Sequence, residues 1–317
     1  MSSRAGSGRR AVRMEDAMDW KRTGNRRGME LKTVPVCGNK IRCEAGEREE
    51  VLDFPMLQFP ALSGTGMVRH CFTTRLGGVS QGIFSTLNLS FIRGDDPEAV
   101  TENYRRVAQA LDVDFRRIVC SDQTHTTNVR TVTEADAGKG LTRPKDYTDV
   151  DGLITNVPGL TLATFYADCV PLYFVDPVHR AIGLSHSGWR GTAARMGQVT
   201  LKAMKEQYGT DAEDVICAIG ASICQDCYEV SVDVAEVFWR EFPNREAEIL
   251  EEKGNGKYQL NLWKANEIVL LEAGVQPGHL SVTDICTCCN PEFLFSHRAS
   301  HGKRGNLGAF LSLIPEV

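Results

Sequence analysis

The sequence predicts an α+β protein, a single domain in which mixed, largely antiparallel sheets are covered by helices. Short apolar, β-prone runs outnumber the helical patterns, and turns of hairpin composition mix with helical connections. Hydrophobic residues make up 42% of the 317 residues, enough for one sizeable core. No internal repeat, coiled coil or interior linker interrupts the pattern, so we expect one domain over residues 55–317.

A basic segment precedes that domain. Residues 1–40 hold 10 Lys and Arg against 4 Asp and Glu, without sustained periodicity. We therefore expect residues 1–50 to form a disordered basic tail. The opening MSSRAGSGRR lacks the apolar stretch of a secretory signal. An organelle transit peptide is the alternative, against which the acidic residues Glu15, Asp16 and Asp19 argue.

Composition and net charge indicate which cellular compartment and which binding partners to expect. Eleven cysteines are an odd number, and without a secretory signal they are expected as thiols, metal ligands or core residues in a reducing cytoplasm. No apolar run approaches the roughly 18 residues of a membrane span. The formal net charge of −5 gives no indication of nucleic-acid binding. We expect small-molecule substrates, with no membrane and no obligatory protein partner.

Strands are predicted where β-prone residues run between turn signals. The run over residues 68–75 ends in Leu76-Gly77-Gly78-Val79-Ser80, where the Gly pair permits a tight turn. A short run over residues 118–120 leads into the loop that carries His125. The predicted strands lie at 51–59, 68–75, 118–120, 129–132, 170–175, 181–185, 215–219, 280–285 and in the last apolar stretch.

Helices are predicted from apolar spacing and from capping residues. Asp95-Asp96-Pro97-Glu98 begins a helix, with an Asp cap and Pro in the first turn. We expect Arg105 and Arg106 on its outer face. Thr192 is expected to cap a helix over residues 193–208. Further helices are predicted over residues 233–242 and 260–273. The buried face of the first helix is predicted to consist of Val100, Tyr104, Val107 and Leu111.

The segment from Thr161 to Gly191 concentrates the reactive side chains. Two apolar runs flank the turn Asp176-Pro177-Val178-His179-Arg180, so we expect an antiparallel hairpin whose paired residue numbers sum to about 356. Cys169 and His186 sum to 355 and would lie roughly opposite each other. A slip of one residue would move one of them to the other face.

Cys169 and His186 admit three interpretations. They can be a buried thiol and a core imidazole, or a nucleophile and base in which the imidazole lowers the thiol pKa. They can also be metal ligands, with His125 as third donor. One thiolate and two imidazoles suit zinc, and three protein ligands leave a fourth position open, as catalytic sites require.

Copper is the alternative metal for the same donors. A copper electron-transfer site usually takes its ligands from a short Cys-His-Met loop, and no Met follows Cys169 closely. A trinuclear copper cluster needs many imidazoles in His-x-His pairs, whereas this chain has 7 His and no such pair.

Charged residues near these donors are candidates for acid–base chemistry and anion binding. Asp168 points away from Cys169 in a regular strand, but a kink before Pro171 would let it act as acid or base; pairing with Arg190 is the alternative. Arg190 lies where His186 leads through two glycines into a helix, a natural phosphate pocket. Arg75, beside the Gly pair, is a second anion candidate.

A second group of cysteines indicates a possible structural zinc. Cys224 and Cys227 have Cys-x-x-Cys spacing, whereas Cys286, Cys288 and Cys289 form an irregular cluster. Buried thiols that bind no metal are the alternative.

Several motifs together resemble the polyphenol oxidase/laccase-domain family over roughly residues 60–317. They are Tyr166-Ala-Asp-Cys169-Val-Pro171, His186-Ser-Gly-Trp-Arg-Gly-Thr192, Thr74-Arg-Leu-Gly-Gly-Val-Ser80, Ser85-Thr-Leu-Asn-Leu89 and Cys227-Tyr-Glu-Val230. The resemblance implies an α/β/β/α fold like that of the cytotoxic necrotizing factor catalytic domain, a putative cysteine hydrolase fold. It also implies a metal held by His125 of a Gln-x-His motif with Cys169 and His186.

The family is similar in activity to zinc enzymes that phosphorolyse adenosine, inosine, guanosine and methylthioadenosine, and that deaminate adenosine. This sequence departs from the family at Thr126, where Gly is usual, and at Ser296-His297-Arg298-Ala299, where Ser-Tyr-Arg-Arg is usual. Arg304-Gly305-Asn306 stands where Thr-Gly-Arg is usual. The first departure leaves the metal donors intact, and the other two affect substrate contacts.

We therefore expect a zinc-dependent purine nucleoside phosphorylase with adenosine deaminase activity, acting on purine nucleosides and inorganic phosphate. Cys169, His186 and Asp168 are the expected catalytic residues, and Arg75 and Arg190 the expected substrate contacts. The alternatives are a metal-free cysteine hydrolase or deamidase that uses Cys169 and His186, a copper-dependent polyphenol oxidase, and a binding protein derived from an enzyme.

Overall fold

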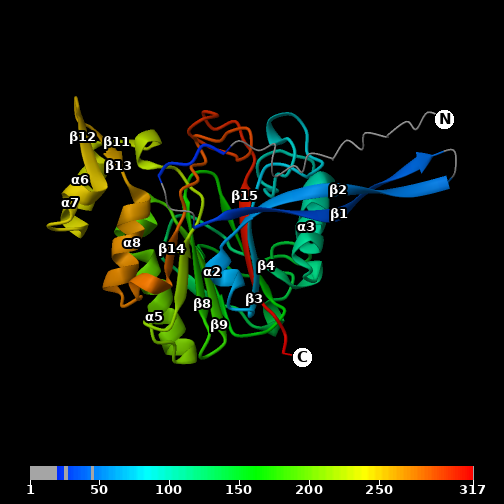
Figure 1. Cartoon of the computed structure of the whole chain (residues 1–317), viewed down its shortest axis with the longest axis horizontal. Coiled ribbons are helices and arrows are strands. Elements are labelled where there is room, and N and C mark those ends of the chain that lie inside the picture. Colours follow the sequence, from blue (N-terminus) through cyan, green and yellow to red (C-terminus); the bar gives the residue numbers. More distant parts are fainter. Residues whose placement is uncertain (1–19, 25–27, 44–45, 317) are drawn as a thin grey trace, which may run out of the picture.

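The computed structural model describes residues 20–24, 28–43 and 46–316, which form one mixed α/β domain. Two six-stranded sheets pack against each other, and helices cover their outer faces (Figure 1). The predicted fold class is confirmed, because most strand pairs are antiparallel and only β4–β7, β5–β6 and β10–β14 are parallel.

The first sheet is covered by helix α3 (Pro97–Leu111). Asp96 caps this helix as predicted, since its side chain accepts a hydrogen bond from the Glu98 N–H. Val100, Tyr104, Val107 and Leu111 are buried against the sheet, again as predicted. The strand order is β1 (Glu30–Cys43), β2 (Gly46–Gln58), β3 (Val68–Thr73), β15 (Leu307–Leu313), β7 (Thr161–Tyr166) and β4 (Ile118–Cys120).

The second sheet is covered by helices α5 (Met196–Tyr208) and α8 (Leu262–Glu272). Its inner face meets the first sheet in a core to which Leu162 and Leu311 contribute from one sheet and Tyr173 and Leu184 from the other. The layers therefore follow the α/β/β/α order that the family resemblance implies. The strand order is β14 (Leu280–Val282), β10 (Ile216–Ile219), β8 (Val170–Asp176), β9 (Ala181–Ser187), β6 (Gly152–Thr155) and β5 (Val129–Thr131).

A small third sheet lies beside the second, at the upper left of Figure 1. It consists of β11 (Glu229–Ser231), β13 (Lys257–Leu260) and β12 (Leu250–Gly254), with α6 (Val232–Glu241) and α7 (Glu246–Ile249) next to it. The remaining short helices are α2 (Pro60–Ser63), α4 (Trp189–Ala193), and the 3-10 turns η1 (Gly82–Phe84), η2 (Phe115–Arg117), η3 (Glu134–Asp136), η4 (Gln225–Cys227) and η5 (Pro277–His279).

Ordered structure begins earlier than the sequence predicts. A disordered tail was expected to residue 50, but strand β1 covers Glu30–Cys43 and pairs with β2 in a long hairpin that projects from the body (Figure 1). The cause is cross-strand pairing, which local periodicity in β1 does not reveal: Met29 and Val36 are buried against the rest of the domain. Residues 1–19 of the expected tail lie outside the described residues.

Two predictions about helices are wrong in detail. The helix after the hairpin begins at Trp189, with Gly188 as N-cap, and breaks at Arg195, whose φ is 60°. Thr192 lies inside it, where its hydroxyl contacts Ser187 Oγ at 2.9 Å. Arg106 is buried rather than outward, because its guanidinium pairs with Glu102 and donates to the Gly77 carbonyl.

The hairpin of β8 and β9 is formed as predicted, with its register shifted by one residue. Pro171 pairs with His186 and Asp176 with Ala181, so the paired numbers sum to 357. Asp176 accepts hydrogen bonds from the Val178 and His179 amides, which makes the turn four residues long and centres it after Val178.

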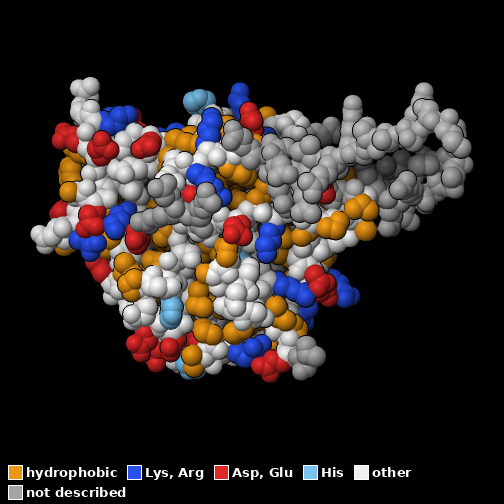
Figure 2. All heavy atoms as spheres, viewed as in Figure 1, with side chains coloured by type: hydrophobic (Ala, Val, Ile, Leu, Met, Phe, Trp, Pro, Cys, Tyr) orange, Lys and Arg blue, Asp and Glu red, His pale blue; other side chains and the backbone are white. Residues whose placement is uncertain are grey.

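The surface carries both signs of charge. On the face drawn in Figure 2, Lys and Arg side chains of the described residues are interspersed with Asp and Glu side chains. None of the helices in the described ranges is long and apolar enough to cross a membrane.

Candidate active site

Cys169 and His186 meet at one end of the β8–β9 hairpin. Cys169 directly precedes β8, and Asp168 before it has a left-handed φ of 89°, which bends the chain in the connection between β7 and β8. The predicted kink is therefore present. His186 lies in β9, and Gly188 two residues later faces the thiol. A Cβ at Gly188 would lie 3.1 Å from Cys169 Sγ and 3.0 Å from His125 Cδ2, so a larger residue would push these two side chains outward by a few tenths of an ångström.

His125 reaches the same place from the loop after β4, with a left-handed φ of 68°. The Asp151 carboxylate holds this loop, since it accepts hydrogen bonds from the backbone N–H groups of Thr124, His125 and Thr126 at 2.9–3.1 Å. Gln123 anchors the loop to β7, because its amide exchanges hydrogen bonds with the backbone N–H and carbonyl of Phe165. These contacts compensate for an unfavourable backbone conformation at His125.

The three side chains form one donor group. One ligand atom from each of His125, Cys169 and His186 lies within 4.8 Å of the other two, and His125 Nε2 is 3.9 Å from Cys169 Sγ. His125 is exposed, Cys169 half-buried and His186 buried, so the group opens to solvent on the His125 side.

Asp151 also orients His186. His186 Nδ1 contacts the Asp151 Oδ1 atom at 2.7 Å, and the His186 backbone N–H donates to the Asp151 carbonyl at 2.8 Å. An ionised carboxylate only accepts, so Nδ1 carries a proton, and Nε2 is the nitrogen that can bind a cation when the ring is neutral. A carboxylate behind a histidine is the usual partner of a metal-bound imidazole.

The charges of the group reinforce one another. Burial opposes the thiolate, but the neighbouring His186 and His125 imidazoles lower the pKa of Cys169 to about 6. Burial also opposes imidazolium, yet Cys169 and Asp151 raise the pKa of His186 to about 9. Burial likewise disfavours ionised Asp151, whereas His186 and the loop amides lower its pKa to about 2. The site therefore favours thiolate, imidazolium and carboxylate, and a cation that binds His186 displaces the proton on its Nε2 atom.

These donors fit a metal ion. One thiolate and two imidazoles are ligands that zinc takes in catalytic sites, and copper accepts the same set. The solvent side of His125 leaves space for a further ligand.

A cavity of about 380 Å³ adjoins the donor group, within the usual size range of small-molecule sites. Phe91 stacks on Tyr104 in its wall at a centroid distance of 5.8 Å. Three cationic side chains also line it: Arg93, Lys145 and Arg304. Burial lowers the pKa of Arg304 to about 10, so it remains charged at neutral pH. The cavity thus joins the metal donors to an aromatic wall and to positive charge.

The other expected site residues are Asp168, Arg190 and Arg75, and their contacts differ from those that the sequence suggested. Both carboxylate oxygens of Asp168 are engaged, one by Thr287 Oγ1 at 2.6 Å and one by the Arg298 backbone N–H at 2.7 Å. The pairing of Asp168 with Arg190, which the sequence offered as the alternative, is not among these contacts. Arg190 lies over the Trp189 ring, and Arg75 lies over the Phe295 ring while donating to two carbonyls. Neither arginine lines the cavity beside the donor group.

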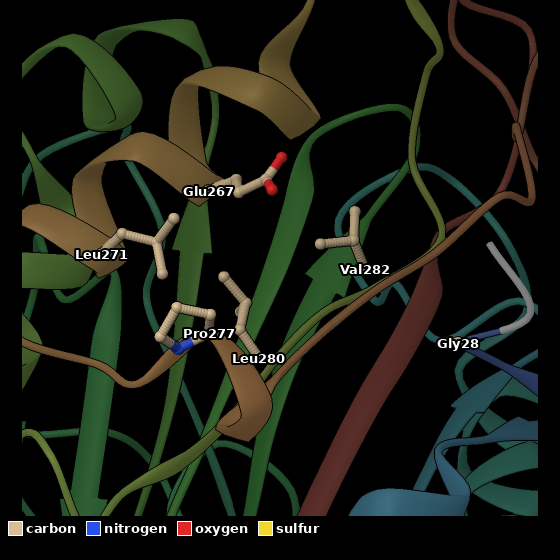
Figure 3. A pocket seen from close by; sticks show the side chains of 6 residues that line it. All are labelled: Gly28, Glu267, Leu271, Pro277, Leu280 and Val282. Atoms are coloured by element: carbon tan, nitrogen blue, oxygen red, sulfur yellow. The ribbon is translucent and has the colours of Figure 1, made fainter.

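A second hollow of about 290 Å³ lies between α8 and β14, without a histidine or a cysteine in its lining (Figure 3). Its lining is small and largely aliphatic, and the charged side chain in it is Glu267. The lining residues are Gly28, Glu267, Leu271, Pro277, Leu280 and Val282.

Comparison with known proteins agrees with this geometry. Residues 69–314 match the family model described as "Multi-copper polyphenol oxidoreductase laccase". This chain belongs to that family. The predicted resemblance is thus confirmed. The family's description names copper, but the match does not identify which metal the donor groups of this chain take.

Named relatives of this laccase-domain protein are nucleoside enzymes. It is 35% identical over 246 residues to purine nucleoside phosphorylase YlmD of Bacillus subtilis, covering 76% of this chain and 87% of that protein. It is 32% identical over 229 residues to adenosine deaminase RL5 of an unknown prokaryotic organism, covering 72% and 87%. The crystal structure of YlmD from Geobacillus stearothermophilus superposes with a TM-score of 0.76 at 35% identity, over 82% of this chain and 96% of that one.

Sequence reasoning missed Asp151, Arg93 and Lys145, and it named Arg304 only within a departure from the family motif. Asp151 follows a polar loop and directly precedes the apolar strand β6, which is a common place for a functional carboxylate. This position could have indicated Asp151 as a functional residue. Its contact with His186 could not be inferred from local sequence, because His186 lies 35 residues later.

Proposed function

We propose that this protein is a zinc-dependent purine nucleoside phosphorylase, acting on adenosine, inosine, guanosine and methylthioadenosine, that also deaminates adenosine. The observation that carries the proposal is the convergence of His125, Cys169 and His186 beside a cavity with an aromatic wall and three cations. The names of the relatives support the same reaction classes. We take residues 55–317 as the catalytic part of the domain, to which β1 and the first residues of β2 add the edge of the first sheet.

In this proposal His125, Cys169 and His186 hold the ion. When bound, zinc supplies a Lewis acid that withdraws electron density from an adjacent oxygen. Asp151 keeps the proton on His186 Nδ1 and fixes the ring, and it also fixes the loop of His125. One carboxylate thus positions two of the three proposed ligands.

Phosphate needs positive charge close to the nucleoside. In phosphorolysis a phosphate oxygen forms a bond to C1′ of the ribose while the bond from C1′ to the purine nitrogen breaks and its electron pair leaves with the base. Arg93, Lys145 and Arg304 line the cavity and are the proposed phosphate contacts, although Lys145 is also paired with Asp122 of the same lining. They replace Arg75 and Arg190, neither of which lines this cavity. Phe91 offers a partly exposed ring against which a purine can stack.

Asp168 acts in this proposal as a positioning residue. Its carboxylate is held by Thr287 and Arg298, and its left-handed backbone directs the next residue, Cys169, out of the strand. With both oxygens engaged, it is not free to exchange a proton with substrate as the sequence suggested.

A second candidate is a metal-free cysteine hydrolase. The observation in its favour is the chain of contacts from Cys169 through His186 to Asp151, which has the nucleophile, base and carboxylate order of a catalytic triad. The position of His125 favours the metal proposal, because a triad has no use for a second imidazole whose Nε2 lies 3.9 Å from the thiol.

The test is phosphorolysis of adenosine and inosine by the purified full chain, with zinc and copper quantified in the same sample. We expect zinc in the active protein, and His125→Ala to lose both the zinc of this site and the phosphorolysis. Full activity in His125→Ala, or active protein without metal, would contradict the proposal.

Cys169→Ser separates the two candidates. If the protein is a cysteine hydrolase, this variant loses all hydrolysis while His125→Ala keeps it. If the zinc proposal holds, both variants lose phosphorolysis and deamination together with the metal of the donor group.

A further inference from the structure

The structure brings together four cysteines outside the proposed active site. Cys224 and Cys227 follow β10, and Cys286 and Cys289 follow β14. Because β10 and β14 are parallel neighbours, the two segments leave the sheet at the same end. A bridge between Ser222 and Cys286 continues the pairing past the strands, so two Cys-x-x-Cys pairs face each other.

The four sulfur atoms have the spacing of a single tetrahedral ion. All four Sγ atoms lie within 4.8 Å of one another, with 3.5 Å between Cys227 and Cys289 and 3.9 Å between Cys224 and Cys289. A tetrahedral zinc with Zn–S bonds of about 2.3 Å places its sulfurs about 3.8 Å apart. An S–S bond needs about 2.05 Å, so the observed spacing does not correspond to a disulfide.

Two backbone donors support negative charge on one of these sulfurs. Cys286 Sγ accepts hydrogen bonds from the Cys224 N–H at 3.2 Å and from the Cys289 N–H at 3.4 Å. Cys224 and Cys286 are buried, and Cys227 and Cys289 are half-buried, so none of the four donors is exposed. A closed set of four thiolates is typical of structural zinc sites and not of catalytic ones.

We propose that Cys224, Cys227, Cys286 and Cys289 bind a structural zinc ion, separate from the metal proposed for His125, Cys169 and His186. The two groups share no residue, so either can be correct without the other. The family's description names copper and not zinc, and the names of the relatives mention no metal.

This ion would stabilise the backbone that positions Cys169. Thr287, next to Cys286, donates to Asp168, and the Ile223 N–H, next to Cys224, donates to the Asp168 carbonyl at 3.0 Å. Arg298 connects the same elements, since its backbone N–H donates to Asp168 and its guanidinium donates to the Cys227 carbonyl at 3.2 Å. Cross-linking the two cysteine segments would therefore hold the Asp168 bend in place.

Metal analysis of the full chain tests the proposal. We expect two zinc ions per chain, one for each donor group, and one per chain in His125→Ala. Cys289→Ser is expected to lose the structural ion, and Cys288→Ser, the matched control in the same segment, to keep it. Retention of both ions in soluble Cys289→Ser, or their loss in Cys288→Ser, would overturn the ligand assignment.

The His125→Ala chain keeps the test valid if the cysteine variants do not fold. Its remaining zinc should be released by a mercurial that titrates thiols, and cobalt in its place should show intense thiolate-to-cobalt absorption. No metal in this variant, iron instead of zinc, or a Cys227–Cys289 disulfide in its mass spectrum would overturn the proposal. Loss of phosphorolysis with the structural zinc retained bears on the proposed function alone.

Discussion

Two buried histidines of this protein have opposite protonation behaviour. His70 in β3 and His186 in β9 are 1% and 3% exposed. Burial, with Lys32 nearby, lowers the pKa of His70 to about 3, and its Nε2 accepts the Phe59 N–H at 2.9 Å. At His186 burial acts in the same direction, but Cys169 and Asp151 raise the pKa to about 9.

The difference shows that the neighbours of each ring, and not burial, decide whether its pKa is lowered or raised. His70 lies near the Phe59 and Tyr173 rings and needs only to satisfy one backbone N–H. His186 has a carboxylate on one side and a thiol on the other, the surroundings of a group that binds a cation or transfers a proton.

Replacing each histidine by glutamine should give the largest difference in catalytic activity between two variants. We expect His186→Gln to lower kcat/KM for phosphorolysis by on the order of 10³-fold, because it removes a proposed metal ligand. His70→Gln retains an oxygen that can accept the Phe59 N–H, and should stay within a few-fold of wild type. Steady-state kinetics with zinc content decide the comparison. Equal losses in the two variants would mean that the imidazoles do not differ in role.

Acid should destabilise the protein through His70. The unfolded ring has a pKa near 6.5 and the folded ring about 3, so below pH 6.5 only the unfolded state takes up the proton. The free energy of unfolding should therefore fall as the pH drops from about 6.5 toward 3, with a contribution on the order of 4 kcal/mol, and be unaffected by this group above pH 6.5.

Urea unfolding between pH 7 and pH 4 measures this contribution. His70→Gln cannot take up the proton, so its unfolding free energy should fall less steeply with acid than that of the wild type. Parallel pH profiles for the two proteins would show that His70 does not titrate on unfolding.

Asp151→Asn should weaken zinc binding less than the loss of a ligand does. It removes the charge behind His186 and replaces one acceptor for the His125 loop, so we expect 10- to 100-fold weaker zinc binding. Asp149→Asn is the matched control, since Asp149 is exposed and its left-handed φ of 56° suits asparagine. A competition titration with a zinc chelator measures the affinity, and equal effects of the two variants would refute the role of Asp151.

The smallest predicted effect is on the KM for phosphate. Arg304→Gln should raise the KM for phosphate about 10-fold with little change for the nucleoside, since it removes one charge-assisted contact from the cavity. Arg190→Gln is the matched control outside the cavity lining. A larger effect on phosphate in Arg190→Gln than in Arg304→Gln would return the anion contact to the residue that the sequence suggested.

Local sequence was sufficient for much of the fold. Helix α3 begins at Pro97 with its Asp96 cap, and the β8–β9 hairpin forms between the predicted runs, because capping, turn chemistry and apolar spacing act over a few residues. Strand β1 and the buried Arg106 were not predicted, since both depend on partners elsewhere in the chain: β2 for the strand and the Gly77 carbonyl for the arginine.

The sequence by itself determined the donors of the candidate site: His125, Cys169 and His186 were named from residue type, turn position and family motifs, and the structure brings them together. Only the tertiary structure decided what surrounds them. Asp151 behind His186, the cations of the cavity, and the meeting of the two Cys-x-x-Cys pairs depend on segments that are distant in sequence. The same is true of Asp168, whose left-handed bend is held by Thr287 and Arg298, more than a hundred residues away, so its direction could not be inferred from local periodicity.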